Sequence, residues 1–249
     1  MENLNFFTNR RTIRSYSDRE VTTETIQELM EAAVRTSTTG NMQLYSVVVS
    51  RDKEVKEALA PLHFNQPVVR NAPAILTFCA DFNRFTAWCK QRNATPGYAN
   101  FQGFFTAAID ALIAAQTFCV AAEARGLGIC YIGTTTYNTK GITKVLNLPK
   151  LVVPVTTITL GYPENQPEQA DRLPIEAIIH QEKYTDYTSD DIDRYYFNKE
   201  SLETSRQFIT DNNKETLAQV FTDVRYSKEM FEKFSTEFME AIREQGFEF

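Results

Sequence analysis

Histidine and cysteine are scarce in this chain of 249 residues, which contains two histidines and four cysteines. The cysteines form no C-x-x-C pair, and two histidines are too few to complete the usual zinc sites. We therefore expect no metal centre and four reduced, mostly buried thiols.

Glycine and proline are also few, with nine residues of each, and no Gly/Ser/Pro-rich stretch or long run of one charge marks a flexible linker. Apolar residues make up 43% of the chain and charged residues 23%, which is typical of a folded globular protein. The net charge of −6 provides no general field for a nucleic-acid backbone or an anionic membrane. These features favour one domain with additions and a small-molecule partner, with no nucleic acid and no membrane.

Several common sequence signatures are missing. The first residues lack the basic start and the long apolar run of a signal peptide, so we expect a cytoplasmic protein. No G-x-x-x-x-G-K-[ST], G-x-S-x-G or H-E-x-x-H pattern occurs. Gly126-Leu127-Gly128 is not a dinucleotide fingerprint, because these glycines follow a predicted helix and precede a predicted strand, which is the reverse of the required order.

The segment 101–125 is apolar nearly all round and ends at Gly126 and Gly128. A transmembrane span is the alternative interpretation, and it is disfavoured because Asp110 and Gln116 lie within the segment and the rest of the chain is polar enough to be soluble. Its many alanines allow a neighbouring helix to approach closely. The segment therefore predicts a long, buried central helix at a subunit interface.

Shorter segments alternate between strand and helix patterns. Thr22 or Thr23, Asp52 and Asn138 are the expected helix N-caps. We expect helices over residues 22–36, 53–62 and 139–146, and strands over residues 45–50, 74–80, 129–133 and 152–160. This alternation predicts an α/β (α+β) fold, a mixed central sheet flanked by helices.

Beyond Arg172 the chain becomes polar and aromatic, with helical patterns near residues 190–212 and 228–244. We expect a core domain over residues 1–185. A helical C-terminal extension over residues 186–249 is expected to belong to the same domain, to wrap a partner subunit or to cover a site.

Two polar segments lie close to the expected helices. Residues 10–16 (R-R-T-I-R-S-Y) place arginines and hydroxyls in one turn, which suits a phosphate but also fits a solvated basic loop. Residues 35–43 (R-T-S-T-T-G-N-M-Q) end a helix in hydroxyl and amide groups, which could face a ribityl chain or a heterocycle, or form an ordinary helix C-terminus. Neither segment decides between its two interpretations alone.

In combination, four segments resemble the FMN-dependent nitroreductase superfamily over roughly residues 1–185. They are R-R-T-I-R-S-Y, S-T-T-G-N-M-Q, G-L-G-I-C-Y-I-G and L-G-Y-P…D-R-L-P, in that order. More narrowly, the chain resembles the oxygen-insensitive NADPH-nitroreductase and flavin-reductase branch, with its H-R-S-I-R-x-F turn, Y-I-G-G strand and K-P-R-L-P motif. The resemblance implies the nitroreductase-like fold and a homodimer with two FMN molecules at the subunit interface.

The resemblance also implies a set of FMN-binding residues. Arg14 would lie near the pyrimidine edge of the flavin, where positive charge stabilises the reduced, anionic ring. Gln66 matches the glutamine that hydrogen-bonds the ring. The full set is Arg10, Arg11, Thr12, Arg14, Thr38, Gly40, Gln43, Gln66, Tyr131, Ile132, Gly133, Thr134 and Arg172.

Within this set, the first three residues and Arg172 would bind the phosphate. The partner subunit would contribute Thr38, Gly40 and Gln43. The backbone N–H groups of residues 131–134 would approach the reactive edge of the ring.

The chain departs from the branch at two places. Ala170 stands where the branch has the lysine of K-P-R-L-P, and the additional cation at Arg10, which replaces a histidine, can compensate. Thr134 stands where a glycine is usual, which can crowd the flavin face or restrict the backbone. The tail shows no clear match to residues that the branch uses on the NADPH 2′-phosphate, so the donor is NADPH or NADH.

Since a flavin supplies redox chemistry, no catalytic acid, base or nucleophile of the protein is required. The expected activity is ping-pong reduction of nitro compounds, quinones or flavins by NAD(P)H. Two alternatives stay open: a flavin reductase that supplies reduced FMN to a partner, and a flavin-binding sensor or interaction protein with little turnover.

Overall fold

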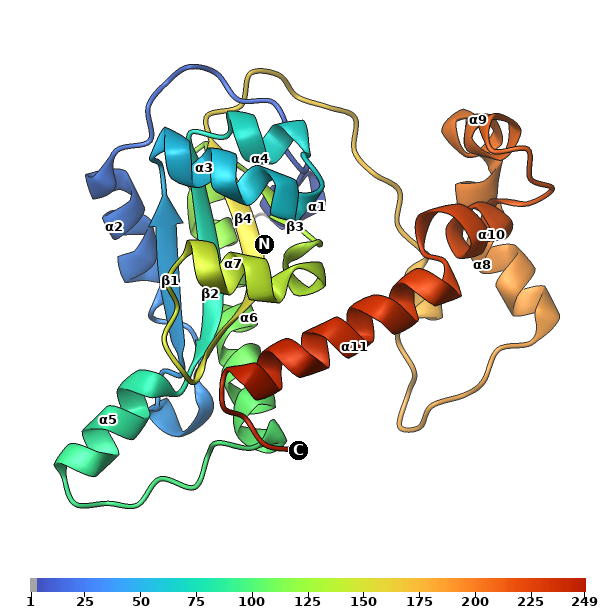
Figure 1. The fold of residues 1–249 in the computed structure, drawn as a ribbon. Coiled ribbons are helices and arrows are strands. Elements are labelled where there is room, and N and C mark those ends of the chain that lie inside the picture. Colours follow the sequence, from blue (N-terminus) through green and yellow to red (C-terminus); the bar gives the residue numbers. More distant parts are fainter. Residues whose placement is uncertain (1–3) are drawn as a thin grey trace. The chain divides into compact units, whose positions relative to one another are not determined.

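The computed structural model describes residues 4–249, and the first three residues of the segment inspected for a signal peptide lie outside it. Its centre is a four-stranded sheet with the order β1-β2-β4-β3 (Figure 1). The strands are β1 (Tyr45–Ser50), β2 (Ala74–Asp81), β3 (Gly128–Ile132) and β4 (Val152–Gly161). All three pairings are antiparallel, so the α+β class is confirmed, whereas the sheet of the described residues contains no parallel pair.

The two central strands explain why the sheet sits in the core. Every residue of β2 is buried, and nearly every residue of β4 is buried as well, because helices cover both faces. Pro154 cannot donate a ladder hydrogen bond, and the register between β2 and β4 shifts where Cys79 faces it. The edge strands β1 and β3 are shorter, and they carry the segments that lead to the candidate site.

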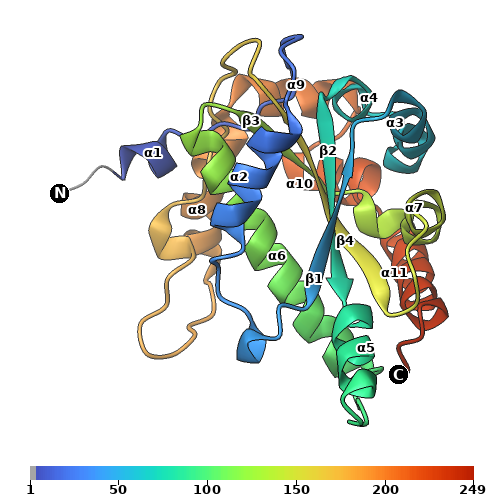
Figure 2. The same ribbon diagram turned by 90° about the vertical axis from the view of Figure 1, so that its left-hand side faces the viewer.

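One face of the sheet is covered by α2 (Thr23–Ala33) and α6 (Phe101–Ala124) (Figure 2). The hydroxyl of Thr22 caps α2 by accepting from the Thr25 N–H at 3.2 Å, so the predicted cap is confirmed. The apolar cluster on this face joins Leu29 of α2, Phe118 of α6 and Leu76 of β2. Among the described residues α6 alone has the length and hydropathy of a membrane span, yet its alanines pack against the sheet as predicted for a core helix.

The opposite face is covered by α3 (Lys53–Leu59), η2 (Ala60–His63), α4 (Pro67–Asn71) and α7 (Thr139–Val145). Asp52 caps α3 as predicted, since its carboxylate accepts from two backbone N–H groups. Asn138 does not cap α7, contrary to expectation, because its side-chain amide donates to the Leu62 carbonyl at 2.7 Å instead. That bond ties the start of α7 to the end of η2.

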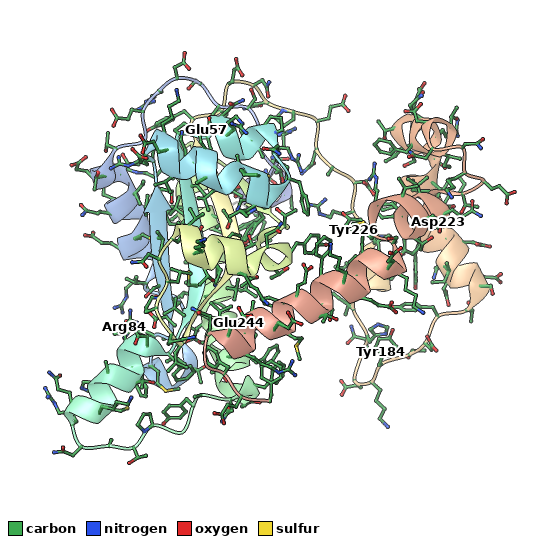
Figure 3. The ribbon with its side chains drawn as sticks, in the orientation of Figure 1. Glu57, Arg84, Tyr184, Asp223, Tyr226 and Glu244 are labelled. Carbon is green, nitrogen blue, oxygen red and sulfur yellow. The ribbon has the colours of Figure 1, made fainter. Side chains whose placement is uncertain are left out.

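The remaining elements before residue 168 are α1 (Asn5–Thr8), η1 (Thr39–Asn41), α5 (Asn83–Gln91) and η3 (Thr135–Tyr137), and the end of α11 (Lys228–Glu244) belongs with them. Lys140 of α7 pairs with Glu240 and with Glu244 of α11, the latter labelled in Figure 3. Ile242 and Phe247 pack into a third apolar cluster together with Phe104 of α6. The four cysteines are free and buried, as predicted.

The chain divides into two compact units, one formed by residues 4–167 and 234–249 of the described chain and the other by Glu168–Lys233. The second unit contains η4 (Ile175–Ala177), α8 (Ser189–Ser201), α9 (Glu203–Asp211), α10 (Leu217–Gln219), the π-helical turn η5 (Val220–Arg225) and the start of α11. Thr188 and Thr216 begin α8 and α10 with capping boxes. The predicted division at residues 185/186 stays a prediction, and contacts place the compact unit from residue 168 to residue 233.

Candidate functional site

Residues 10–17 lie beside the end of the sheet and are fixed there by backbone bonds. The Ile13 N–H donates to the Ile129 carbonyl of β3 at 3.0 Å, and the Ser17 N–H donates to the Tyr162 carbonyl at 2.9 Å. Gly128 makes the approach possible, because a Cβ there would lie 2.5 Å from the Ile13 Cβ. The predicted phosphate turn is therefore held against the start of β3.

Three arginines emerge from this turn in different environments. Arg10 Nε lies 2.9 Å from Oε1 of Glu123 on α6, and Arg11 Nη1 donates to the Asn9 carbonyl at 3.2 Å. Arg14 is exposed and reaches the Cys130 thiol in the middle of β3. Burial raises the pKa of that thiol, and the charge and hydrogen bond of Arg14 partly oppose the shift. The turn thus offers positive charge from the start of β3 to its middle, and Thr12, half-buried, lies between these arginines.

A second group of predicted residues lies where β3 ends. Gln66 Nε2 donates to the His63 carbonyl at 3.1 Å and to the Thr134 hydroxyl at 3.3 Å. Gly133 is exposed, and a Cβ built on it would meet nothing within 4 Å, so a ligand can approach its backbone. Ile132 is buried beneath them. The structure therefore brings together Gln66, Ile132, Gly133 and Thr134.

Tyr131 points to the other side of β3. Its hydroxyl donates to Gln116 Oε1 of α6 at 3.3 Å, and burial raises the pKa of that hydroxyl, which stays protonated near neutral pH. The side chain of Tyr131 thus supports the strand against α6, and only its backbone remains available for the predicted role.

β3 sets the distance between the cations and the amide group. Three residue steps separate Ile129, which pairs with the arginine turn, from Ile132, and they span roughly 10 Å at the usual rise of a strand. The residues present fit an elongated ligand that carries an anion at one end and a flat, hydrogen-bonding ring at the other. No group of three or more metal-ligating side chains occurs among residues 4–249.

The predicted loop Thr38–Gln43 is held at a different place. Asp110 of α6 is 1% exposed and accepts from the Thr38 hydroxyl, from the Thr39 N–H at 2.9 Å and from the Leu44 N–H at 3.3 Å. Gly40 and Gln43 have φ near +55°, so the loop relies on these bonds to keep a left-handed backbone. The loop is a rigid attachment to the middle of α6.

This loop and the arginine turn attach to α6 at two separate points, the loop at the middle of the helix and the turn at its C-terminal end. Asp110 and Glu123 are 13 residues apart, which corresponds to about 20 Å along a helix. The structure therefore does not bring Thr38, Gly40 and Gln43 together with Arg10 and Arg14 within one chain.

Arg172 lies in the second unit. Its guanidinium donates to the carbonyls of Ala170 and Asp171, at 3.4 and 2.7 Å. Its role at the phosphate stays a prediction.

The first half of α6 presents an uncovered apolar face. Its large side chains are between 39% and 49% exposed, at a spacing that places them along one side of the helix: Phe101, Phe105, Ile109, Leu112 and Ile113. An apolar strip of this kind on a folded domain marks an interaction surface.

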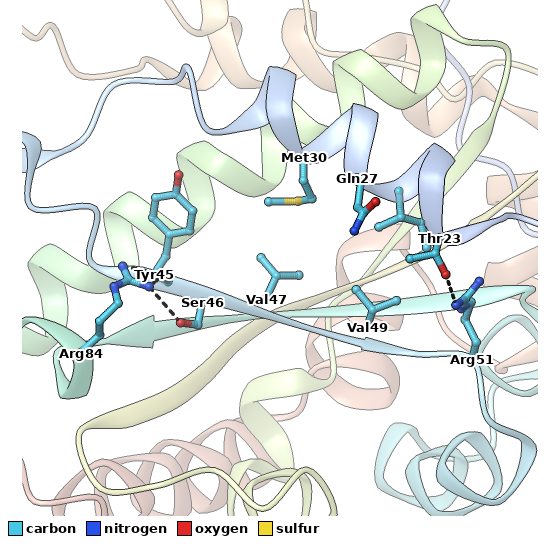
Figure 4. A pocket seen from close by; sticks show the side chains of 10 residues that line it. Thr23, Gln27, Met30, Tyr45, Ser46, Val47, Val49, Arg51 and Arg84 are labelled. Carbon is cyan, nitrogen blue, oxygen red and sulfur yellow. Dashed lines mark hydrogen bonds between the residues drawn. The ribbon is translucent and has the colours of Figure 1, made fainter.

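A groove of about 530 Å³ between α2 and β1 does not contain the predicted residues (Figure 4). Met30, Tyr45 and Val47 line it, with Arg51 bound to Thr23 at one end and Arg84 bound to Ser46 at the other. Since its walls hold no cluster of the predicted cofactor residues, we assign the chemistry to the β3 region.

Sequence reasoning missed three residues that organise the site: His63, Asp110 and Glu123. Asp110 was noticed only as an argument against a membrane span, although a lone carboxylate in an apolar helix signals that buried donors await it. The partners of all three residues lie far away along the chain, 71 residues for His63 and 113 for Glu123, so no local pattern identifies them.

Comparison with known proteins gives a consistent result. The model of the Nitroreductase family matches residues 7–162. The Bacillus subtilis protein named FMN reductase (NADPH) is 36% identical over 184 residues, 73% of this chain and 74% of that protein. The Salmonella typhimurium oxygen-insensitive NADPH nitroreductase is 32% identical over 213 residues, 83% of this chain and 87% of that protein. A Bacteroides fragilis protein of known structure superposes with a TM-score of 0.97 at 56% identity, covering 98% of this chain and 99% of that one.

Proposed function

This chain belongs to the nitroreductase family, and on that premise we propose that it is an FMN-dependent NAD(P)H oxidoreductase of nitro compounds, quinones or flavins. The observation that carries the proposal is the arrangement along β3, with arginines at its start and middle and the Gln66–Thr134 pair at its end. That arrangement suits the phosphate and the ring of one FMN molecule.

Each group of residues has a defined task in this proposal. Arg10, Arg11 and Thr12 hold the phosphate by charge-assisted hydrogen bonds. Arg14 places a positive charge near the pyrimidine edge, where negative charge develops during reduction.

The residues at the end of β3 complete the site. The backbone of Tyr131, Ile132, Gly133 and Thr134 lines the reactive edge, and Gln66 orients the ring. Bound FMN supplies the two-electron redox chemistry, and the protein binds it, tunes it and admits NAD(P)H and the acceptor in turn, in a ping-pong sequence.

We further propose a homodimer in which the loop Thr38–Gln43 serves the partner's FMN. Two features support it: the loop lies about 20 Å along α6 from the arginine turn of its own chain, and α6 exposes an apolar strip. A second copy packed on that strip would bring the loop of one chain to the β3 region of the other. We also propose that the enzyme acts in the cytoplasm on small molecules.

The test of the proposed activity starts from cofactor content. The purified protein should be yellow and release FMN rather than FAD, because the arginine turn suits one terminal phosphate. It should oxidise NADPH or NADH in the steady state with menadione or nitrofurazone as acceptor. A colourless protein that takes up no flavin on titration contradicts the proposal, and a yellow protein without turnover indicates a sensor or interaction protein.

A second candidate is a flavin reductase that passes reduced FMN to a partner, because a 36% identical relative is named an FMN reductase. The two functions differ in the fate of the flavin. If free FMN saturates the enzyme at lower concentration than any nitro compound or quinone, and leaves it reduced, the flavin-reductase role holds.

A further inference from the structure

His63 is a buried imidazole that the proposed chemistry does not use. It is 0% exposed, and its Nδ1 lies 2.9 Å from the hydroxyl of Thr134, while its Nε2 has no hydrogen-bond partner in the described part of the chain. Burial lowers the pKa of His63 to about 4, so the ring is neutral near pH 7. A buried polar atom without a partner is costly and asks for an explanation.

The hydroxyl of Thr134 joins His63 to Gln66. Gln66 Nε2 donates to the His63 carbonyl at 3.1 Å and to Thr134 Oγ1 at 3.3 Å, so the contacts use both hydrogens of the amide. Because a backbone carbonyl only accepts, the nitrogen must be the atom that faces it. The side-chain oxygen of Gln66 is therefore left to accept from a ligand.

The backbone around Gln66 is also held in an unfavourable shape. Phe64 and Asn65 both have φ of +54°, a left-handed conformation that residues other than glycine rarely adopt. Arg70 fixes this bend, since its guanidinium donates to Asn65 Oδ1 at 3.1 Å and pairs with Glu57, which Figure 3 labels on α3. The buried His63 anchors the other side of the bend.

We propose that His63 and Thr134 are positioning residues that hold the Gln66 amide with its oxygen toward the ligand, an inference that rests on the proposed FMN site. Thr134 can accept from Gln66 with either neutral form of the imidazole. With a proton on Nδ1, His63 and Gln66 both donate to the Thr134 oxygen; with a proton on Nε2, the Thr134 hydroxyl donates to Nδ1 and still accepts from Gln66.

His63 and Thr134 together determine which atom of the Gln66 amide faces the ligand. A Gln66 side chain without this support could rotate and present either its N–H or its oxygen. Held by Thr134, it presents an acceptor, which selects a ring with a matching N–H, as in the imide of a flavin. Thr134 stands where the similar branch has a glycine, which carries no hydroxyl, so this support belongs to the particular sequence of this chain.

The experiment compares four variants by FMN titration of the apoprotein. Thr134→Val removes the hydroxyl at nearly constant shape, Thr134→Ser keeps it, and His63→Phe keeps a ring without polar atoms. We expect Thr134→Val and His63→Phe each to raise the Kd for FMN roughly 10-fold, which is the loss of about one hydrogen bond. Thr134→Ser should stay within about 3-fold of the wild type, and Ile142→Val, in the apolar cluster of the same sheet face, serves as the packing control.

Coupling and spectroscopy separate positioning from mere packing. Because His63 acts through Thr134, the double variant His63→Phe/Thr134→Val should bind FMN about as well as Thr134→Val alone, not 10-fold worse. In the apoprotein, the side-chain NH₂ protons of Gln66 should exchange slowly in the wild type and in Thr134→Ser, and rapidly in Thr134→Val.

The outcomes are distinguishable. Additive losses of FMN affinity, or rapid exchange of the Gln66 amide in the wild type, overturn the positioning role. Should His63→Phe fail to fold, the Val and Ser variants at position 134 decide alone, by Kd and by exchange. If the side-chain NH₂ protons of Gln66 exchange slowly but the protein binds no flavin, the proposed function is contradicted and the hydrogen-bond network is supported.

Discussion

Two carboxylates of the same helix α6 have different kinds of partner. Asp110 is 1% exposed and accepts hydrogen bonds from neutral donors only, two backbone N–H groups and two threonine hydroxyls, all from residues 38–44. Glu123, with a side chain 12% exposed, pairs with the cation of Arg10. One carboxylate fixes a backbone, and the other restrains a charged side chain.

This difference between the two carboxylates determines how the loop at Asp110 and the arginine turn at Glu123 can respond to a ligand. Four hydrogen bonds to Asp110 fix the conformation of the loop Thr38–Gln43 before any ligand binds, because a buried carboxylate cannot lose these donors without a large cost in free energy. Arg10 can instead exchange Glu123 for a phosphate, since one ion pair replaces another. The attachment at Asp110 is therefore preorganised, whereas the attachment at Glu123 is adjustable.

The largest effect is expected from mixing chains that are damaged at the two different attachments to α6, the loop at Asp110 and the arginine turn at Glu123. A chain with Arg10→Glu and Arg14→Glu should be inactive alone, and so should a chain in which Thr38, Gly40 and Gln43 are replaced by bulky residues. In a mixed dimer with shared sites, one site carries both lesions and the other carries neither. After co-refolding, each heterodimer should therefore have up to half the activity of a wild-type dimer, measured as NADPH oxidation with menadione.

The control for this experiment is heterodimer formation itself, followed with differently tagged chains. If heterodimers form and activity stays absent, each site is built within one chain. An active monomer in light scattering contradicts the shared site as well.

The second prediction concerns the contribution of Asp110 to the stability of the fold. Asp110→Ala leaves four donors of the loop without their acceptor and should lower the free energy of unfolding by about 3 kcal/mol, and Asp110→Asn by less. Urea denaturation at one fixed protein concentration measures the change. Gln102→Ala, at an exposed position of the same helix, is the control and should change it by no more than about 0.5 kcal/mol. A loss below 1 kcal/mol for Asp110→Ala would show that the loop does not depend on this carboxylate.

Local patterns predicted most of the fold. The strand 45–50 was predicted to the residue, and the helix caps at Thr22 and Asp52 are present, because a strand's alternation and a cap's hydrogen bond depend on neighbours in sequence. The prediction at Asn138 failed because that side chain depends on a residue far away in sequence. Asn138 was misassigned as a cap because its amide found the Leu62 carbonyl, 76 residues away, and no local pattern reports such a contact.

The candidate site was predictable only as far as a family resemblance reaches. Motifs identified the arginine turn, Gln66 and the strand that ends at Ile132, and the structure brings these to the two ends of β3. The resemblance could not indicate the partners of residues that differ from the branch. The hydroxyl of Thr134 bonds His63 and Gln66, and the resemblance gave no indication of these contacts.

The third prediction addresses the exposed cation near the middle of β3. Arg14→Ala should leave most FMN bound, because Arg10, Arg11 and Thr12 still serve the phosphate. It should lower the flavin midpoint potential and slow reduction by NADPH roughly 10-fold, since the charge favours the anionic reduced ring more than the oxidised one. Stopped-flow absorbance and redox titration measure the two effects. An unchanged potential and an unchanged rate would remove Arg14 from the site.

The smallest effect is expected at Glu123, where the partner is adjustable. Burial raises the pKa of this carboxyl above its usual 4.5, and the ion pair with Arg10 only partly opposes that shift. From pH 4.5 up to the folded-state pKa, the folded chain therefore keeps a proton that the unfolded chain has lost, so this residue's contribution to stability is full below pH 4.5 and falls as the pH rises. Glu123→Gln should lack that slope, so the unfolding free energy of the wild type minus that of the variant should fall as the pH rises, measured by urea denaturation at several pH values. It should also leave the Kd for FMN within about 3-fold of the wild type, or lower it, because Arg10 then faces the phosphate without a competing carboxylate. A rise of the Kd by 10-fold or more would mean that Glu123 positions Arg10 for the phosphate. The attachment at Glu123 would then be preorganised, like the one at Asp110, and the contrast between the two carboxylates would fail.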